Sequence, residues 1–445
     1  MNTPRLLNDE QMQHFIRNGH IALQTQLPAE LHQGIHGQIE KLFAREGNPG
    51  NDILPKVPDL YEVLEAPIVR GALSSLLGPQ YIVHPHRHCH LSPGGSKGQN
   101  MHQDSYENDQ NVRHHRCRWA MAFYYPHDVS LHNGPSAAIP ASQHYNSDQE
   151  ALQRTELPLV GPAGTFTIVH YDLWHRAMPN HSDRDRFMVK FLFARLREPQ
   201  KPTWDHGHSV WQETTNDGPP SALCRSAWNW FGGANTTEQG HNGATPERLA
   251  QNLRSAHEHE RLTAAYALTT CGDDGVSLLV EALRTEAVAQ AEHNIGRDHT
   301  NPSQLDTVLA LAAAGAAALH PTRALLSAKE WPLRAAAAAV LGDMGNQALE
   351  AVPQLERALR DDDEWVRRNA VEALGNMGPA AAEAVPSLCD MLRDRCEAVR
   401  HNAALALAKI GPAAAAAEPA LTEALADENL YVRENARIAL DHIAA

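Results

Sequence analysis

Two short stretches of the chain carry side chains that could bind a metal ion. His102 and Asp104 are two positions apart, so in an extended strand they present an imidazole and a carboxylate to the same side. A second histidine, His175, ends a later strand-like run at residues 164–174. Two histidines and one carboxylate on one face of iron form a facial triad, which leaves the other positions open for further ligands. We therefore expect His102, Asp104 and His175 to act as metal ligands and catalytic residues.

A further strand is predicted at residues 186–193, where the phenylalanines and Val189 alternate with a second set of side chains that includes Arg186, Met188 and Lys190. The phenylalanines and Val189 fall on one side, so Arg186 and Lys190 fall on the other, toward the interior. A cation buried there needs a partner, because an unpaired buried charge is very costly. A dicarboxylate would supply one through a bidentate pair with Arg186. Arg184, which has the same parity, is the alternative.

Two helices are expected before the strands, within residues 7–45. Asn8, with Gln11 three residues later, fits a capping box, and apolar residues follow at helical spacing. The apolar stripe of the second helix consists of Leu31, Ile35, Ile39 and Leu42. We expect both helices to pack on the outside of a β-core.

The motifs follow one another in the order of a known family. After a helical start at Leu7 to Gly19 come His102-Gln-Asp104, Asn133-Gly-Pro135 and His175-x4-Asn180-x-Ser182-x3-Arg186. Over roughly its first half, the chain resembles the phytanoyl-CoA dioxygenase family of Fe(II)- and 2-oxoglutarate-dependent oxygenases. The resemblance implies a double-stranded β-helix, which is a jelly-roll or cupin-like fold.

The resemblance also implies a reaction. Fe(II) would be held by His102, Asp104 and His175, while Arg186, eleven positions after His175, would bind the far carboxylate of 2-oxoglutarate. O2 would decarboxylate 2-oxoglutarate to succinate and CO2, with hydroxylation of a substrate C–H bond as the default outcome. Halogenating relatives need a vacant position where the carboxylate ligand lies, and Asp104 fills it.

Three more positions bear on cosubstrate binding. Trp119 is placed near the cosubstrate by resemblance, and a plain core tryptophan is the alternative. Gln103 is a further candidate cofactor-binding residue. Many family members carry a small hydroxyl residue where this chain has Ala177, so one hydrogen bond to the cosubstrate is expected to be missing.

Other motifs are weaker. Four histidines alternate in one strand-like run, at His84, His86, His88 and His90. They offer a second metal site, or else belong to the wall of the site or to the surface. Pro85 within the run predicts an edge or irregular strand. Residues 94–98 match the GxSxG pattern of a hydrolase nucleophile, but no helix is predicted behind them, so we expect a turn.

Composition limits the class of protein. The length of 445 residues favours two to four domains. The formal net charge of −15 argues against a nucleic-acid partner bound through phosphates. The six cysteines show no CxxC spacing, and no run of residues is apolar enough to cross a membrane. A soluble cytoplasmic protein is expected.

The C-terminal part of the chain is repetitive, with a period of 33 residues. The period relates three prolines (Pro353, Pro386, Pro419), three Val-Arg pairs (at Val366, Val399, Val432) and three glycines (Gly345, Gly378, Gly411). Such a period in alanine- and leucine-rich helices predicts an α-solenoid, here of HEAT-like repeats. We expect degenerate copies earlier, near Leu333, at residues 305–315 and at residues 261–272. The recurring acidic residues and Val-Arg pairs should form a ladder of caps and ion pairs between repeats.

The predicted fold class is α+β, a double-stranded β-helix followed by an all-α solenoid. An oxygenase domain is expected at residues 1–240, a linker at 241–250 and the HEAT-like solenoid at 251–445. The predicted function is Fe(II)- and 2-oxoglutarate-dependent hydroxylation of a small molecule such as an amino acid, natural product or lipid. The alternative is a protein or peptide hydroxylase whose solenoid recognises the substrate or a partner protein.

Overall fold

The computed structural model describes residues 3–104, 114–207, 210–212, 218–234, 244–293 and 301–444. The chain divides into two compact units. The β unit comprises Met1–Asp104, Cys117–Arg195 and Lys201–Pro219, and the helical unit comprises Ser105–Arg116, Leu196–Gln200 and Pro220–Ala445. The predicted boundaries at 240 and 250 stay predictions.

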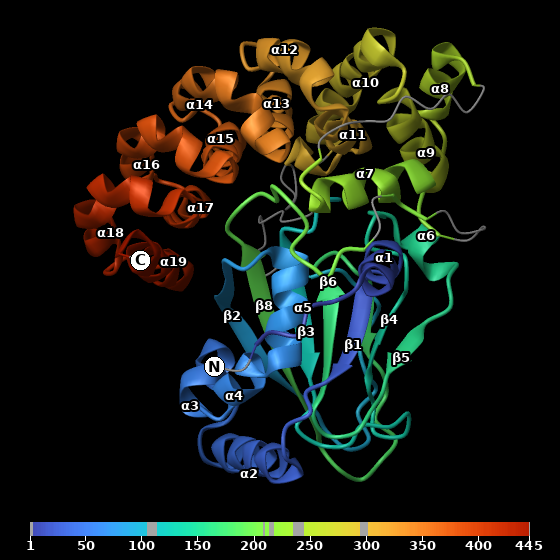
Figure 1. Cartoon of the computed structure of the whole chain (residues 1–445), viewed down its shortest axis with the longest axis vertical. Helices are drawn as coiled ribbons and strands as arrows, with labels where there is room; N and C mark the ends of the chain where they lie inside the picture. The colour runs from blue at the N-terminus through green and yellow to red at the C-terminus, as the bar shows by residue number, and fades with distance from the viewer. Residues whose placement is uncertain are drawn as a thin grey trace. The chain divides into compact units, whose positions relative to one another are not determined.

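The β unit contains two antiparallel sheets (Figure 1). Its strands are β1 (His20–Gln24), β2 (Tyr81–Ser92), β3 (Trp119–Tyr124), β4 (Ser136–Ala138), β5 (Leu157–Leu159), β6 (Thr165–His170), β7 (His175–Ala177) and β8 (Arg186–Arg195). Within the described residues, one sheet has the order β1-β6-β3-β8-β2 and the other the order β5-β4-β7. The double-stranded β-helix class predicted for this part of the chain is confirmed.

Helices surround these sheets. They are α1 (Asp9–Asn18), α2 (Ala29–Glu46), α3 (Ile53–Lys56), α4 (Leu60–Glu65), α5 (Pro67–Leu77) and α6 (Asp148–Leu152), with a 3-10 turn η1 (Gly50–Asp52). The capping box of α1 is present, because Asn8 and Gln11 bond each other's backbone N–H. Helix α5 lies along one face of the larger sheet (Figure 1). The two predicted N-terminal helices are thus α1 and α2.

Strand β2 is an edge strand, as Pro85 predicted. Among the strands of the described residues it pairs with β8 alone, and its register breaks between Val83 and Arg87. Strand β8 lies between β2 and β3 and is buried along its whole length. Side chains on both faces of β8 are therefore shielded from solvent.

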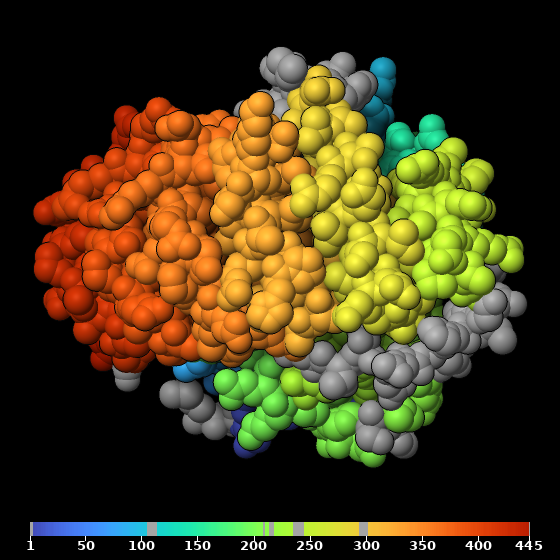
Figure 2. Space-filling view, turned by 90° about the horizontal axis from the view of Figure 1, so that it is seen from above, coloured from blue at the N-terminus to red at the C-terminus, as the bar shows by residue number. Residues whose placement is uncertain are grey.

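The helical unit is a run of helices connected by short 3-10 turns. Its helices are α7 (Ser221–Phe231), α8 (Pro246–Asn252), α9 (Glu258–Leu268), α10 (Gly272–His293), α11 (Asp306–Ala314), α12 (Ala316–Leu325), α13 (Trp331–Met344), α14 (Val352–Ala358), α15 (Glu364–Met377), α16 (Val385–Met391), α17 (Glu397–Ile410), α18 (Glu418–Ala424) and α19 (Leu430–Ala444). The 3-10 turns are η2 (Pro302–Gln304), η3 (Gly345–Ala351), η4 (Gly378–Ala384) and η5 (Gly411–Ala417). Figure 2 shows successive repeats side by side in chain order, from yellow to red. The predicted solenoid is confirmed.

The predicted ion-pair ladder joins successive repeats. One arginine from each of three repeats pairs with an aspartate of the next, as Arg334–Asp361, Arg367–Asp394 and Arg400–Asp427, at 2.6–2.8 Å. Each of these arginines also donates to backbone carbonyls just before its own helix. Arg261 makes a similar ion pair with Asp306 at 3.2 Å, and the degenerate copy expected at residues 261–272 stays a prediction.

Glycines end helices α13, α15 and α17 sharply and allow α15 and α17 to approach each other closely. Gly345 and its two repeat equivalents end α13, α15 and α17 with φ values of 58–66°, in the left-handed region that favours glycine. A Cβ on Gly375 would lie 2.8 Å from the Cα of Ala406, so α15 and α17 pack in direct backbone contact there.

None of the helices in the described part of the chain combines the length and apolar character that a bilayer crossing requires.

A segment from the first half of the sequence belongs to the helical unit. His114 lies between two carboxylates, with Nδ1 2.9 Å from Asp343 and Nε2 3.2 Å from Glu372. Arg116 donates to the backbone carbonyl of Asp343, near the end of α13, and to that of Ala312, near the end of α11. Cations at helix C-termini are favourable, because the unpaired carbonyls carry partial negative charge.

His114 should make the stability of the helical unit depend on pH. Burial alone would lower the pKa of His114, but Asp343 and Glu372 raise it to about 9. Because the folded pKa exceeds the unfolded value, this stabilisation is complete below about pH 6.5 and is lost as pH rises toward 9. We expect the free energy of unfolding to fall by roughly 3 kcal/mol more over this window in the native chain than in His114→Gln. Urea titrations at a series of pH values, followed by helical circular dichroism, measure the free energy of unfolding. If this free energy depends on pH equally in both proteins, the expectation is contradicted.

Candidate metal and cosubstrate site

His102 and His175 lie directly opposite each other on neighbouring extended segments. The N–H of His102 donates to the carbonyl of His175 at 3.0 Å, and the reverse bond is 2.9 Å. In such an antiparallel pair the two side chains project to the same side of the sheet. The imidazole rings accordingly lie 4.7 Å apart, measured between centroids.

Backbone hydrogen bonds orient both imidazoles. Nδ1 of His102 is 2.9 Å from the carbonyl of Asn100, and Nδ1 of His175 is 2.9 Å from that of Leu173. A carbonyl only accepts, so each Nδ1 carries the proton and each Nε2 keeps its lone pair. Histidine ligands of metals are commonly held in this way.

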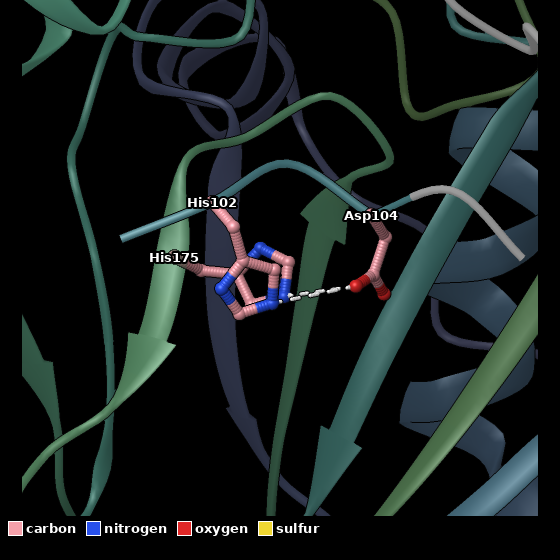
Figure 3. A group of neighbouring side chains, drawn as sticks. All are labelled: His102, Asp104 and His175. Carbon is pink, nitrogen blue, oxygen red and sulfur yellow. Dashed lines mark ion pairs between the residues drawn. The ribbon is translucent and has the colours of Figure 1, made fainter. Parts of the chain in front are cut away.

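Asp104 completes the group, and Figure 3 shows its carboxylate directed at the two rings. One oxygen, Oδ1, lies 3.6 Å from Nε2 of His102 and 3.7 Å from Nε2 of His175. Burial alone would raise the pKa of Asp104, but His175 and Lys190 hold it well below its usual range. The carboxylate is therefore ionised, as a metal ligand must be.

The three donors suit iron. Their ligand atoms all lie within 4.8 Å of one another, and no other such group of His, Cys, Asp or Glu occurs in the described part of the chain. Two imidazoles with one carboxylate and open positions form the facial triad of non-haem Fe(II) sites. The predicted ligands are thus brought together.

Lys190 forms an ion pair with the other oxygen of Asp104. Its Nζ lies 2.6 Å from Oδ2, and both side chains are largely buried. The inward orientation expected for Lys190 is confirmed, and Asp104 is the partner that its buried charge requires.

Arg186 lies buried in the same cavity with most of its guanidinium unused. Its Nε donates to the carbonyl of Gly134 at 2.8 Å, whereas Nη1 and Nη2 are buried and have no partner among the described residues. Burial lowers the pKa of Arg186, but an arginine stays charged in proteins. Two parallel N–H donors at a cavity match the geometry of a carboxylate.

The loop before β8 is built by Asn180. Its side chain donates to the carbonyls of Ser92 and Arg184, and it accepts from Ser182. Gly134 packs against the same residue, since a Cβ on Gly134 would lie 2.9 Å from the Cα of Asn180. These contacts place Arg186 inward, while Arg184 is exposed and does not line the cavity.

The cavity has a volume of about 190 Å³. Its lining includes His102, Asp104 and His175 and four basic side chains, Lys97, Arg176, Arg186 and Lys190. Asp104 is the single carboxylate among these lining residues, and Arg176 is paired outside the set with Glu156 at 2.8 Å. A surplus of positive charge favours an anionic ligand.

The cosubstrate roles of Gln103 and Trp119 are not supported by their contacts. Gln103 points away from its neighbours in the motif and donates to the carbonyls of Tyr145 and Asp172, at 3.1 and 2.6 Å. Trp119 lies against His84 at the start of β3 and does not line the cavity. Phe123, further along the same strand, lines the cavity instead, and its ring centroid lies 5.5 Å from that of His175. Both roles stay predictions.

The histidine run belongs partly to the cavity wall. His90 lines the cavity, and burial lowers the pKa of His86 and of His90 to about 3, so both are neutral. Among described residues the run forms no group that could hold a metal. Residues 94–98 form a turn without a following helix, as expected. Ala177 lies at the cavity, where it offers no hydroxyl.

Comparison with known families agrees with this geometry. Residues 15–188 match the model of the phytanoyl-CoA dioxygenase family. This segment is a phytanoyl-CoA dioxygenase domain. HEAT repeats match at residues 319–397 and 379–441, within the helical unit. The predicted 2-oxoglutarate-dependent oxygenase is thus confirmed, and the matched segment contains every residue that lines the cavity except Lys190, which lies two positions beyond its end.

Several solved structures match part of this chain at low sequence identity. The carbocyclase SnoK from nogalamycin biosynthesis is 16% identical with a TM-score of 0.37, over 44% of this chain and 88% of its own. EctD from S. alaskensis, with 2-oxoglutarate and 5-hydroxyectoine, is 17% identical with a TM-score of 0.38, over 46% and 82%. The nickel complex of the monooxygenase ThoJ is 17% identical with a TM-score of 0.34, over 49% and 93%. No curated protein sequence matches the chain.

Proposed function

We propose that the phytanoyl-CoA dioxygenase domain hydroxylates an unactivated C–H bond of a small molecule. Fe(II) is held by His102, Asp104 and His175, and 2-oxoglutarate is the cosubstrate. One atom of O2 enters succinate as CO2 leaves, and the other becomes the hydroxyl group of the product. Amino acids, natural products and lipid-like compounds are the proposed substrate class.

The unsatisfied guanidinium of Arg186 carries this proposal. A buried cation with two donor nitrogens free is costly unless a ligand completes it. A dicarboxylate long enough to reach both Arg186 and the metal site satisfies both ends. Bound Fe(II) would supply the redox chemistry that activates O2. The protein supplies the orientation of the ligands and a cavity that is small and positively charged.

A protein or peptide substrate, recognised by the helical unit, is the second candidate. HEAT-like repeats commonly serve as binding surfaces, which favours it. However, Asp343 and Glu372 of the helical unit are already paired with His114 of the same chain. The small volume of the cavity also favours the small-molecule reading.

Arg186→Met tests the cosubstrate site. Anaerobic titration of the Fe(II)-loaded chain with 2-oxoglutarate reports binding through the weak visible charge-transfer band of the chelate. We expect half-saturation to need about 100-fold more 2-oxoglutarate in the variant, because each hydrogen bond between charged groups contributes ~1.5–3 kcal/mol.

The matched control is Arg184→Met, which removes an exposed arginine two positions away. It should leave the titration unchanged. Arg186→Met should also be at least as stable as the native chain without ligands, since it removes a buried unpaired charge. Equal 2-oxoglutarate affinity in both variants contradicts the assignment of Arg186.

A further inference from the structure

We propose that Lys190 is a positioning residue that restricts Asp104 to binding the metal through one oxygen, which keeps a coordination position open for O2. The inference rests on the proposed function of the site. It assigns a role in the reaction to an ion pair that otherwise serves only to neutralise charge.

The two oxygens of Asp104 have different partners. Oδ1 lies 3.6–3.7 Å from the Nε2 atoms of both histidine ligands, where a metal would be bound. Oδ2 accepts a hydrogen bond from Nζ of Lys190 at 2.6 Å. Charge-assisted bonds of this kind are short and strong, so Oδ2 is held away from the metal.

Strand β8 fixes the lysine in this place. Lys190 lies opposite Phe123 on one neighbouring strand and opposite His88 on the other. The strand is buried throughout, and Asp104 is the only hydrogen-bond partner of Lys190 within the described residues. The ammonium therefore has no competing acceptor that would release Oδ2.

Coordination geometry gives the ion pair its consequence. Three facial protein ligands on an octahedral ion leave three adjacent positions. A chelating 2-oxoglutarate would fill two of them, and the third would be left for O2. If Oδ2 also bound the metal, the carboxylate would occupy two positions and the O2 position would be lost.

The charge of Lys190 acts in the same direction. Together with the metal and Arg186 it leaves the cavity with excess positive charge until a dianion enters. An ammonium this close therefore weakens metal binding and strengthens 2-oxoglutarate binding. Nearby charges commonly shift such equilibria by about tenfold or more.

The test compares Lys190→Met and Lys190→Gln with the native chain, each loaded with Mn(II). Line broadening of the Mn(II) EPR signal in 17O-enriched water counts metal-bound water molecules. We expect three in the native chain and two in Lys190→Met, whose Asp104 is free to bind through both oxygens. Lys190→Gln retains a donor for Oδ2 and should keep three.

Binding of 2-oxoglutarate to the Mn(II)-loaded proteins gives the second readout. We expect at least about tenfold weaker binding in both lysine variants, since both lose the charge. Lys201→Met, which removes an exposed lysine outside the cavity, should keep three waters and native affinity.

The outcomes separate the two proposals. If the native chain binds no metal, the proposed function fails and this inference fails with it. If the native chain binds Mn(II) with three waters and Lys190→Met does the same with unchanged 2-oxoglutarate affinity, Lys190 is only a structural counter-ion. The variants lose Lys190 as the partner of Asp104, but the bound metal ion takes over that role. The carboxylate is therefore not left buried and unpaired in the state that is measured.

Discussion

His175→Ala is expected to abolish tight binding of Fe(II) by the full-length chain. The variant removes one of three ligand atoms that lie within 4.8 Å of one another, and nothing else in the described chain replaces it. Loss of a mere hydrogen-bond partner of a metal ligand commonly costs ~10–100-fold in affinity. Loss of the ligand itself should therefore exceed about 100-fold. Anaerobic equilibrium dialysis with Fe(II) measures the effect.

His88→Ala is the matched control, because His88 lies in the histidine run and outside the triad. It should retain one equivalent of Fe(II) with native affinity. The pair of variants also decides between the two metal sites that the sequence offers. Retention of iron by His175→Ala, with its loss from His88→Ala, would place the metal at the histidine run instead.

The metal triad could be predicted because its geometry follows from local rules. Alternation in an extended segment puts His102 and Asp104 on one side, whatever the rest of the fold. The distance along the chain to His175 is not local, and the family resemblance supplied that link. The inward direction of Arg186 followed from strand alternation in the same way, and its unsatisfied guanidinium is what the structure adds.

The partner of Lys190 could not be predicted. Alternation indicates that Lys190 faces inward, but which carboxylate it meets depends on how β8 lies relative to the loop that carries Asp104. The same limit applies to the aromatic wall of the cavity. Trp119 and Phe123 share one face of β3, and only the three-dimensional fold decides that the ring of Phe123 lies near that of His175.

Repeats made the solenoid the most predictable part of the chain. The ladder of Arg334, Arg367 and Arg400 was expected from the 33-residue period alone. The position of His114 within the helical unit could not be predicted, because a single histidine far from the repeats in sequence carries no periodic signal.

Comparison between repeats distinguishes the ion-pair ladder from Asp343 and Glu372, the two acidic residues that pair with His114. One period before and after Glu372, the chain has Ala339 and Leu405. Asp343 is followed one period later by Asn376. The acids that bind His114 therefore occur once, whereas a charge needed only to stack one repeat on the next would recur. We infer that these positions are adapted to the segment that ends at Arg116.

Glu372→Ala is accordingly expected to destabilise the helical unit by about 3–5 kcal/mol, the usual cost of breaking a buried ion pair by removing one partner. Glu372 joins two cations, since it lies 3.2 Å from Nε2 of His114 and 3.1 Å from Nη1 of Arg368. The surrounding charges hold the pKa of Glu372 at about 2, against the effect of burial, so it is ionised across the physiological range. Its loss leaves Arg368, which is 2% exposed, without its carboxylate.

Glu423→Ala provides the control, because Glu423 pairs with Arg393 on the exposed surface of the same repeat array. Exposed pairs contribute little, so the urea midpoint should barely change. In His114→Gln, the further effect of Glu372→Ala should be smaller than in the native chain, because one of the two cations is already gone. Full additivity of the two substitutions would show that Glu372 stabilises the unit through Arg368 alone. Glu372 would then have no special relation to His114.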